Sequence, residues 1–417
     1  MQLSDLEHFS MSIISENIGI LPLRGKVQHY DWGGQQFIPC LIGQPNDDQK
    51  PFAELWMGTH NRGQATLDYQ GKTLLLSELI KEYPEVILGR KVIEQFGNQL
   101  PFLFKILDVD KMLSIQAHPN KAQAEKGFER ENQMGIPRTS SQRNFKDDNH
   151  KPEVMFALTE FWLLHGFRPQ AAILQSLESV PEFNVLADPL KEKGLQELYK
   201  MIMEWPQDRV NTILQPLKDR LLTSLEQNQL HPDQADYWAA LGFRDMTPSA
   251  KLLDRGIFSI YLLNLVKLQP GQAIFQDAGI PHAYLRGVNV ELMANSDNVF
   301  RGGLTRKHID VTTLLDHLIF DPVIPKVISG EKISATETAY PTSAPDFELR
   351  RIHIAPHKVH HNAAANSPAI VILIEGEALV NDQLKLNRGE IILIPANIFC
   401  TIEARNSGAV LFKAIVP

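Results

Sequence analysis

The most informative segment of the chain is Leu113-Ser114-Ile115-Gln116-Ala117-His118-Pro119. Apolar and polar residues alternate in it, which is typical of a β-strand. Because successive side chains of a strand point to opposite faces, Gln116 and His118 point the same way. They can offer an amide oxygen and an imidazole nitrogen to one point, and a metal ion is the usual reason for such a pair.

Two other segments supply further candidate ligands, Glu153 in His150-Lys151-Pro152-Glu153 and His282 in Gly279-Ile280-Pro281-His282. Two imidazoles, a carboxylate and an amide oxygen suit a divalent ion such as zinc. Each residue also fits a structural role: His118 in a surface turn, Gln116 on an exposed strand face, Glu153 in a solvated loop and His282 in a hydrogen-bonded corner. The residues alone therefore leave both interpretations open. No role is assigned to the other histidines, His60, His165 and His308 among them.

The rest of the chain predicts a mainly β protein. Residues 20–155 contain short apolar runs separated by Gly, Pro, Asn and Asp, as in 101–107, with a helix expected at 74–88. Strand-like runs return after Gly256, where we expect one long strand over 257–268, and they continue through 331–417.

A helical insertion is expected between the β regions. Its clearest sign is a three-four spacing of apolar residues, which predicts an amphipathic helix and comprises Val210, Ile213, Leu214, Leu217, Leu221 and Leu225. The predicted division is a first part of the β domain with the candidate ligands at 1–155, the helical insertion at 156–255, the second part of that β domain at 256–330 and a C-terminal β unit at 331–417.

A short internal repeat links the two β regions. Residues 271–278 resemble residues 389–396, and continuing both without a gap places His282 opposite Cys400. We therefore expect two related barrel-like units, of which only the first holds a metal.

Composition excludes several classes of protein. The 417 residues are 43% hydrophobic and carry a net charge of −8, which argues against a nucleic-acid binder because phosphate contacts need clustered Lys and Arg. The two cysteines are too few for a disulfide framework and fit a reducing cytoplasm. No secretory signal and no stretch of roughly 20 apolar residues is seen, so no membrane partner is expected. We expect a cytoplasmic monomer.

Taken together, these segments resemble the type I phosphomannose isomerases. The resemblance runs from about residue 20 to 310 in the family's order, and this ordered set is more specific than any single motif. The matching segments are Tyr30-Asp31-Trp32-Gly33, Ala53-Glu54-Leu55-Trp56-Met57-Gly58-Thr59-His60, Pro101-Phe102-Leu103-Phe104-Lys105, residues 113–121, Asn149-His150-Lys151-Pro152-Glu153, residues 279–285 and residues 290–305.

The resemblance implies a duplicated cupin (jelly-roll) fold with an inserted helical domain and a C-terminal barrel without metal. It implies a zinc-dependent aldose–ketose isomerase of mannose metabolism. Such enzymes interconvert mannose 6-phosphate and fructose 6-phosphate through an enediol and bind one zinc ion per chain. The family's zinc ligands fall on Gln116, His118, Glu153 and His282, and its active-site arginine, lysine and serine on Arg301, Lys151 and Ser114.

The chemistry assigns further roles, some of them with alternatives. Arg301 either stabilises the developing oxyanion or clamps the phosphate. Lys121 and Lys151 are candidate phosphate partners, although Lys121 equally fits a solvated helix start. Ser114 lies one pleat from Gln116, on the same side of the strand.

The catalytic base stays open among a zinc-bound hydroxide, Lys151 and Glu291. Glu291 is equally interpreted as a buried structural carboxylate held by Arg or Lys. Tyr284 either lines the substrate pocket or packs as an ordinary aromatic residue.

Two other classes of function compete with the isomerase. A non-haem iron oxygenase uses two histidines and a carboxylate, but Gln116 as a fourth ligand argues against open positions for oxygen. A sugar-phosphate-binding module without turnover is the other class, and Ser114, Lys151 and Arg301 beside a full ligand set argue against it. A fused nucleotidyltransferase is excluded, because the chain has no Gly-rich phosphate loop and no room for another domain.

Overall fold

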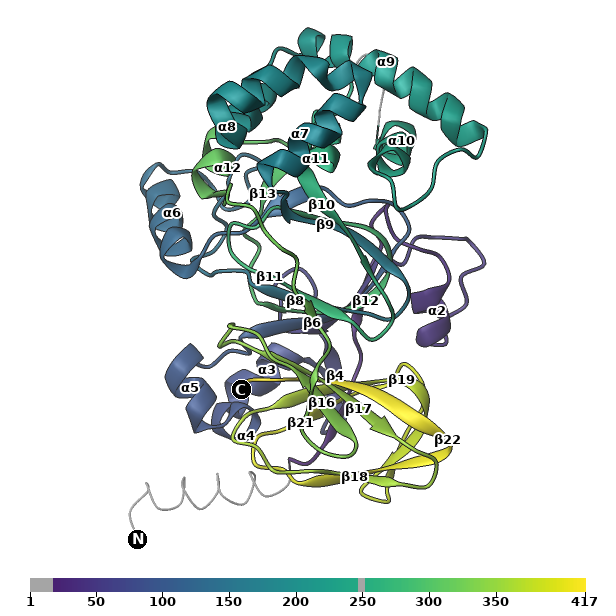
Figure 1. The fold of residues 1–417 in the computed structure, drawn as a ribbon. Coiled ribbons are helices and arrows are strands. Elements are labelled where there is room, and N and C mark those ends of the chain that lie inside the picture. The colour runs from purple at the N-terminus through teal and green to yellow at the C-terminus, as the bar shows by residue number, and fades with distance from the viewer. Residues whose placement is uncertain (1–17, 247–251) are drawn as a thin grey trace.

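Two large antiparallel sheets and a group of helices form the protein, in a computed structural model that describes residues 18–246 and 252–417. In Figure 1 the helices lie at the top, an 11-stranded sheet in the middle and a 9-stranded sheet at the bottom. The prediction of a mainly β protein is confirmed. None of the helices within these ranges is long and apolar enough to cross a membrane.

The 11-stranded sheet is organised around one long strand, β12 (His282–Ala294). Residues 287–294 of β12 pair with β6 and β8, whereas residues 282–286 pair with β7 and β9. The strand β12 therefore joins two groups of strands into one sheet. Side chains from both groups, Leu107 and Leu163 among them, meet in one buried core. The other strands are β2 (Lys26–Gln28), β3 (Glu54–Gly58), β6 (Phe102–Val109), β7 (Ile115–Ala117), β8 (Glu153–Ala157), β9 (Phe161–Phe167), β10 (Leu263–Leu268), β11 (Ala273–Gln276), β13 (Phe300–Gly303) and β14 (Val327–Ile328).

The 9-stranded sheet is built around β19 (Ala369–Val380) and β22 (Cys400–Ile415) and encloses its own aliphatic core. Its other strands are β1 (Leu21–Leu23), β15 (Glu331–Lys332), β16 (Glu337–Tyr340), β17 (Glu348–Ile354), β18 (Val359–Asn362), β20 (Leu384–Leu386) and β21 (Ile391–Ile394). Residues 21–23 were expected in the first β unit, but β1 pairs with β21. The pairing covers an apolar edge strand that would otherwise expose its backbone.

The two segments of the predicted repeat occupy matching places in the two sheets. Strands β11 and β21 each follow a turn with a glycine at positive φ, and β12 and β22 then begin at His282 and Cys400. Glu153 pairs with the last residue of β11, whereas Ala369 pairs with the last residue of β21. Cys400 and Ala369 thus stand where the first unit has His282 and Glu153.

The range predicted as an insertion contains the helices α7 (Gln170–Ser179), α8 (Asn184–Glu204), α9 (Gln207–Glu226) and α10 (Ala235–Met246), with the 3-10 turn η1 (Pro181–Phe183). The amphipathic helix is confirmed, since α9 buries Val210, Leu214, Leu217 and Leu221. The range 156–255 also contains strand β9, and residues 247–251 lie outside the described part.

The prediction of one long strand over 257–268 is wrong in its first half. Residues Gly256–Leu262 form helix α11, and only Leu263–Leu268 form strand β10. All seven residues of α11 are buried, so its sequence lacks the polar positions that reveal a helical period.

Helices also lie beside the two sheets. The helix expected at 74–88 begins at Leu76 and is divided at Tyr83 into α3 (Leu76–Glu82) and α4 (Pro84–Leu88), since Pro84 cannot continue the hydrogen-bond ladder of α3. Both share one buried core with the facing sides of the two sheets. The remaining elements are α2 (Phe37–Leu41), the hairpin β4 (Thr66–Tyr69) and β5 (Lys72–Leu75), α5 (Arg90–Phe96), α6 (Lys121–Gln133) and α12 (Val311–His317).

Candidate metal centre

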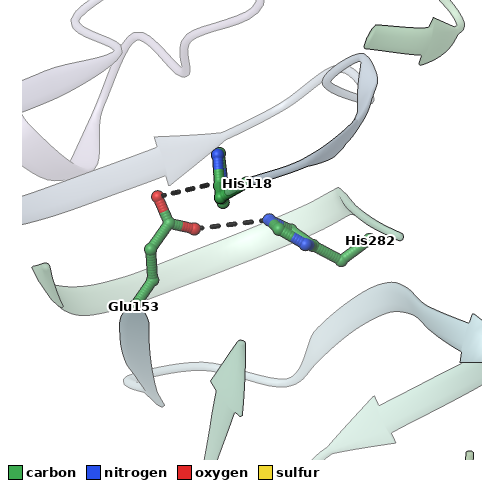
Figure 2. Close-up of side chains that lie close together, drawn as sticks. All are labelled: His118, Glu153 and His282. Carbon is green, nitrogen blue, oxygen red and sulfur yellow. Dashed lines mark ion pairs between the residues drawn. The ribbon is translucent and has the colours of Figure 1, made fainter. Parts of the chain in front are cut away.

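His118, Glu153 and His282 converge inside the 11-stranded sheet (Figure 2). His118 follows β7, Glu153 begins β8 and His282 begins β12, so three separate strands bring them together. One ligand atom from each lies within 4.8 Å of the other two, and all three side chains are buried. The predicted meeting of these three residues is therefore present in the fold.

The two imidazoles are oriented by their outer nitrogen atoms. The Nδ1 atom of His118 lies 2.8 Å from the carbonyl oxygen of Asn298, and that of His282 lies 2.9 Å from the carbonyl oxygen of Ile280. Both Nε2 atoms then face Glu153, at 3.6 Å and 3.3 Å. Within the described residues neither Nε2 atom has a hydrogen-bond partner, although both are buried.

Such orphaned atoms suit a bound ion. A buried polar atom without a partner costs about 1–3 kcal/mol, so two of them beside one carboxylate are unusual in a finished core. Metal-ligating histidines commonly bind the ion with one nitrogen and a backbone carbonyl with the other. The residues present therefore fit a divalent ion with nitrogen and oxygen ligands.

The protonation states also fit a metal. Burial and the neighbouring Lys151 lower the pKa of His118 to about 4, so its imidazole is neutral at pH 7. Burial alone would raise the pKa of Glu153, but Lys151, whose Nζ atom lies at 2.9 Å, and His118 hold it well below its usual value. A neutral imidazole and an ionised carboxylate are the forms that bind metal ions.

Gln116 and Arg301 lie in the same row of residues as His282. Gln116 pairs directly with His282 on β12 and with Arg301 on β13. Directly opposed residues of neighbouring strands share a face, so Gln116 stands next to the histidine and Arg301 one strand further. Ser114 is half-buried and precedes Gln116 by two residues.

A group of cations lies around Arg301. Burial and then Arg62 lower the pKa of Arg301, and burial, Arg301, Arg62 and Lys146 lower the pKa of Lys307. Arg62 forms an ion pair with Asp297 at 2.8 Å, whereas Arg301 and Lys307 form none among the residues that the structure describes. Arg62, Lys146 and Lys307 come from distant segments, and no sequence pattern singled them out.

Glu291 has a buried partner that the sequence did not reveal. Lys105 pairs with it across β6 and β12, with its Nζ atom 3.0 Å from Oε1. Burial raises the pKa of Glu291, although Lys105 opposes this effect. Tyr284 is buried in the same interior, and burial and then Glu291 raise its pKa well above the usual value.

Lys121 lies apart from the metal candidates. It is exposed at the start of α6, where its Nζ atom donates to the carbonyl oxygen of Asp148 at 3.0 Å. It lines a cavity of about 850 Å³, and none of the three metal candidates is among the lining residues. The interpretation as a helix start describes this position, and its contact with substrate stays a prediction.

His165 has surroundings that the sequence did not suggest. It stands opposite His282 on β9, and its Nδ1 atom lies 2.6 Å from Oε1 of Gln276. Burial lowers the pKa of His165 to about 4. Because an isolated histidine in a strand has no distinctive spacing, only the strand pairing identifies this neighbour of the site.

Comparison with known proteins agrees with this geometry. Residues 20–170 match the sequence model of the phosphomannose isomerase type I catalytic domain. Mannose-6-phosphate isomerase of Salmonella typhimurium is 36% identical over 386 residues, which are 90% of this chain and 94% of the relative. The human mannose-6-phosphate isomerase is 35% identical over 411 residues, 91% of this chain and 94% of the relative.

The fold agrees as closely as the sequence. A crystal structure of the Salmonella typhimurium enzyme bound to substrate and zinc superposes with a TM-score of 0.82 at 34% identity, over 95% of this chain and 99% of that one. Likeness of this extent, together with the match over residues 20–170, shows that this chain belongs to the type I phosphomannose isomerase family.

Proposed function

We propose that this chain is a zinc-dependent aldose–ketose isomerase that interconverts mannose 6-phosphate and fructose 6-phosphate through an enediol. The observation that carries the proposal is the convergence on the ionised Glu153 of two imidazole nitrogens that have no hydrogen-bond partner within the described residues. The reaction is inferred from the chain's membership of the family. The cations Arg301 and Lys307 are suited to bind the substrate's phosphate.

One zinc ion is held by Gln116, His118, Glu153 and His282. When bound, the ion supplies a positive charge that polarises the substrate's carbonyl oxygen and stabilises negative charge on it. Lys151 forms an ion pair with Glu153 and so keeps this ligand ionised.

The phosphate lies against Arg301, Lys307, Arg62 and Lys146. Burial and the neighbouring cations lower the pKa of Arg301 and of Lys307, and a dianion beside them relieves this repulsion. Arg301 stands one strand from Gln116, so the same guanidinium also reaches oxygens near the reacting carbons. Ser114 adds a hydroxyl on this face, and Lys121 contacts the substrate only at the rim.

Proton transfer between C1 and C2 needs a base inside the cavity. Two groups of this chain are suited to it, Glu291 and Lys151, both of them buried. The raised pKa of Glu291 brings a carboxyl toward the neutral range in which general bases work best. Tyr284 lies near enough for Glu291 to raise its pKa, and the charge of Lys105 stabilises the buried carboxylate.

The proposed architecture is a duplicated jelly roll of the cupin type, in which β12 and β22 turn the corners of the two barrels. The helical domain is inserted between β9 and β10, and the C-terminal barrel holds no metal. The proposed setting is the cytoplasm, and the proposed state is a monomer without a nucleic-acid partner.

The iron oxygenase is disfavoured by Gln116, which stands opposite His282 and occupies a position that oxygen chemistry would need open. The binding module is disfavoured because Ser114, Lys151 and Arg301 stand beside a full set of candidate metal ligands, which binding alone does not require.

The test is formation of fructose 6-phosphate from mannose 6-phosphate by purified, chelator-stripped and zinc-restored protein. The expected result is activity that disappears on stripping and returns with zinc. Activity that survives verified removal of metal would keep the reaction and refute the role of the ion. Absence of activity in each of the three preparations would refute the isomerase. Oxygen consumption would then favour the iron oxygenase, and substrate binding without conversion would favour the binding module.

A further inference from the structure

A second cavity lies in the helical region, away from the metal centre. Its volume is about 560 Å³, within the range of small-molecule sites, and none of its lining residues belongs to the metal centre. It opens between α7, the loop 229–234 that precedes α10, helix α11 and the start of β10, elements that are labelled in the upper part of Figure 1. The proposed isomerase reaction uses none of its residues.

The cavity contains a half-buried arginine that has no counter-ion among the described residues. Arg168 follows β9, and burial lowers its pKa because no carboxylate in this part of the chain is close enough to offset it. Its Nη1 atom donates to the hydroxyl of Ser176 at 2.5 Å and to the carbonyl oxygen of Tyr261 at 3.5 Å. Within the described ranges Nε and Nη2 of Arg168 have no hydrogen-bond partner. These two N–H groups form the edge of the guanidinium that can bind an oxyanion through two hydrogen bonds.

The neighbouring groups favour a phosphoryl group over a carboxylate. Ser176 accepts a hydrogen bond from Arg168 with its oxygen, so its own proton is free to be donated to a ligand. Ser179 lines the same wall. A phosphoryl group bound by two N–H groups keeps a third oxygen for such a hydroxyl, whereas a carboxylate must accept the hydroxyl proton on an oxygen that the guanidinium already holds.

The cavity lining also includes a carboxylate that accepts hydrogen bonds. Asp233 is exposed and forms no ion pair within the described residues, unlike Asp236, which pairs with Arg220 and accepts the hydroxyl proton of Tyr261. Arg168 and Asp233 line one cavity and form no ion pair within the described residues, which suits a ligand with an anionic end and a hydroxyl-bearing end.

We propose that this cavity is a second, non-catalytic binding site for a small phosphorylated polyol. Its phosphoryl group lies on Arg168 and Ser176 and a hydroxyl group donates to Asp233. The proposal does not depend on the isomerase reaction, since no residue of the metal centre takes part.

The test is calorimetric binding of two probes, inorganic phosphate and glycerol 3-phosphate, to the zinc-loaded protein. The Arg301→Ala background weakens anion binding at the metal centre, so the second site dominates the signal. On this background Arg168→Gln is expected to weaken both probes at least tenfold. The matched control is Arg209→Gln, which removes an exposed arginine of α9 that does not line the cavity and leaves both affinities unchanged.

Two further variants keep the proposal testable if Arg168→Gln fails to fold. Ser176→Asp places a carboxylate against the guanidinium and is expected to abolish binding of both probes while raising thermal stability. Asp233→Asn is expected to weaken glycerol 3-phosphate several-fold more than inorganic phosphate, because only the former has alcohol hydroxyls that can donate to Asp233 while the phosphoryl group stays on Arg168.

Three results would overturn the proposal: no measurable binding of either probe, affinities that Ser176→Asp and Arg168→Gln leave unchanged, or an equal loss in Arg209→Gln. A response to Asp233→Asn that is the same for both probes would refute the polyol as the ligand.

Discussion

Replacing Lys105 by methionine removes one charge from the interior of the catalytic unit and keeps most of the side chain's volume. The Nζ atom of Lys105 lies 3.0 Å from Oε1 of Glu291, and the two side chains are 8% and 4% exposed. Water cannot take the place of the lost ammonium at such a depth. Breaking a buried ion pair by removing one partner costs about 3–5 kcal/mol, and we expect a loss of unfolding free energy of that size at pH 8.

The loss should depend on pH with a definite sign. Burial already raises the pKa of Glu291, and removing Lys105 raises it further. A group whose pKa is higher in the folded than in the unfolded state stabilises the fold at low pH, and this contribution disappears as the pH rises through the folded value. The deficit of Lys105→Met relative to the wild type should therefore be small near pH 5 and grow toward pH 8.

The chain offers a matched control. Lys267 is paired with Glu160 at 2.8 Å and lies over the Trp162 ring, much as Lys105 lies over the Trp56 ring, but Lys267 and Glu160 are 41% and 50% exposed. Exposed pairs contribute about 0–1 kcal/mol, so Lys267→Met should change stability little at any pH. The measurement is urea unfolding of both variants and the wild type, followed by tryptophan fluorescence at pH 5, 6.5 and 8.

A rescue separates lost charge from lost packing. Adding Glu291→Leu to Lys105→Met removes the stranded carboxyl, and replacing a buried pair by apolar residues is often neutral, so most of the stability should return. The reasoning is refuted if Lys105→Met loses no more than Lys267→Met, or if its deficit shrinks as the pH rises.

Three further predictions concern other parts of the molecule. His282→Ala should lose zinc and activity together, whereas Arg301→Ala should keep zinc by metal analysis and lose activity about 100-fold or more, the scale for removing one stabilising donor. Burial alone would raise the pKa of Asp297, but His60 and Arg62 hold it at about 2. Asp297→Asn should therefore lower the unfolding free energy at pH 7 by at most about 2 kcal/mol. This difference from the wild type should disappear as the pH falls from 4 to 2. At pH 8 the native protein should show one reactive thiol, Cys40, and a second only after denaturation, since burial raises the pKa of the Cys400 thiol to about 11.

The pairing of Gln116 with His118 as candidate ligands could be predicted because its signal is local. The alternation in 113–119 places Gln116 and His118 on one face, and β7 has that conformation. The convergence of Glu153 and His282 on the same point rested on the family resemblance, because spacing carries no information about how distant strands pair.

Lys105 could not be found from its pattern. Every residue of β6 is buried, so the strand lacks the alternation that would mark an inward-facing position. Phe102, Phe104 and Ile106 belong to the core shared with the other sheet, which leaves Leu103, Lys105 and Leu107 facing inward. Only the register with β12 shows that the lysine meets Glu291.

The same register shows what distinguishes the two β units. In the first, Glu291 stands between Lys105 and Met155; in the second, Lys413 stands between Arg350 and Val371.

A glutamate occupies the same position on the next strand of each unit. Glu54 pairs with Leu107, two residues after Lys105, and Glu337 pairs with Ile352, two residues after Arg350. Glu337 also forms an ion pair with the buried Lys413. Both interiors thus hold buried acids and bases, so buried charge does not by itself mark a catalytic site. The two units differ at the ends of these strands. The first has His282 and Glu153 at the positions where the second has Cys400 and Ala369. The chemistry proposed for the first unit therefore rests on the candidate ligands at its strand ends, where the second unit has Cys400 and Ala369.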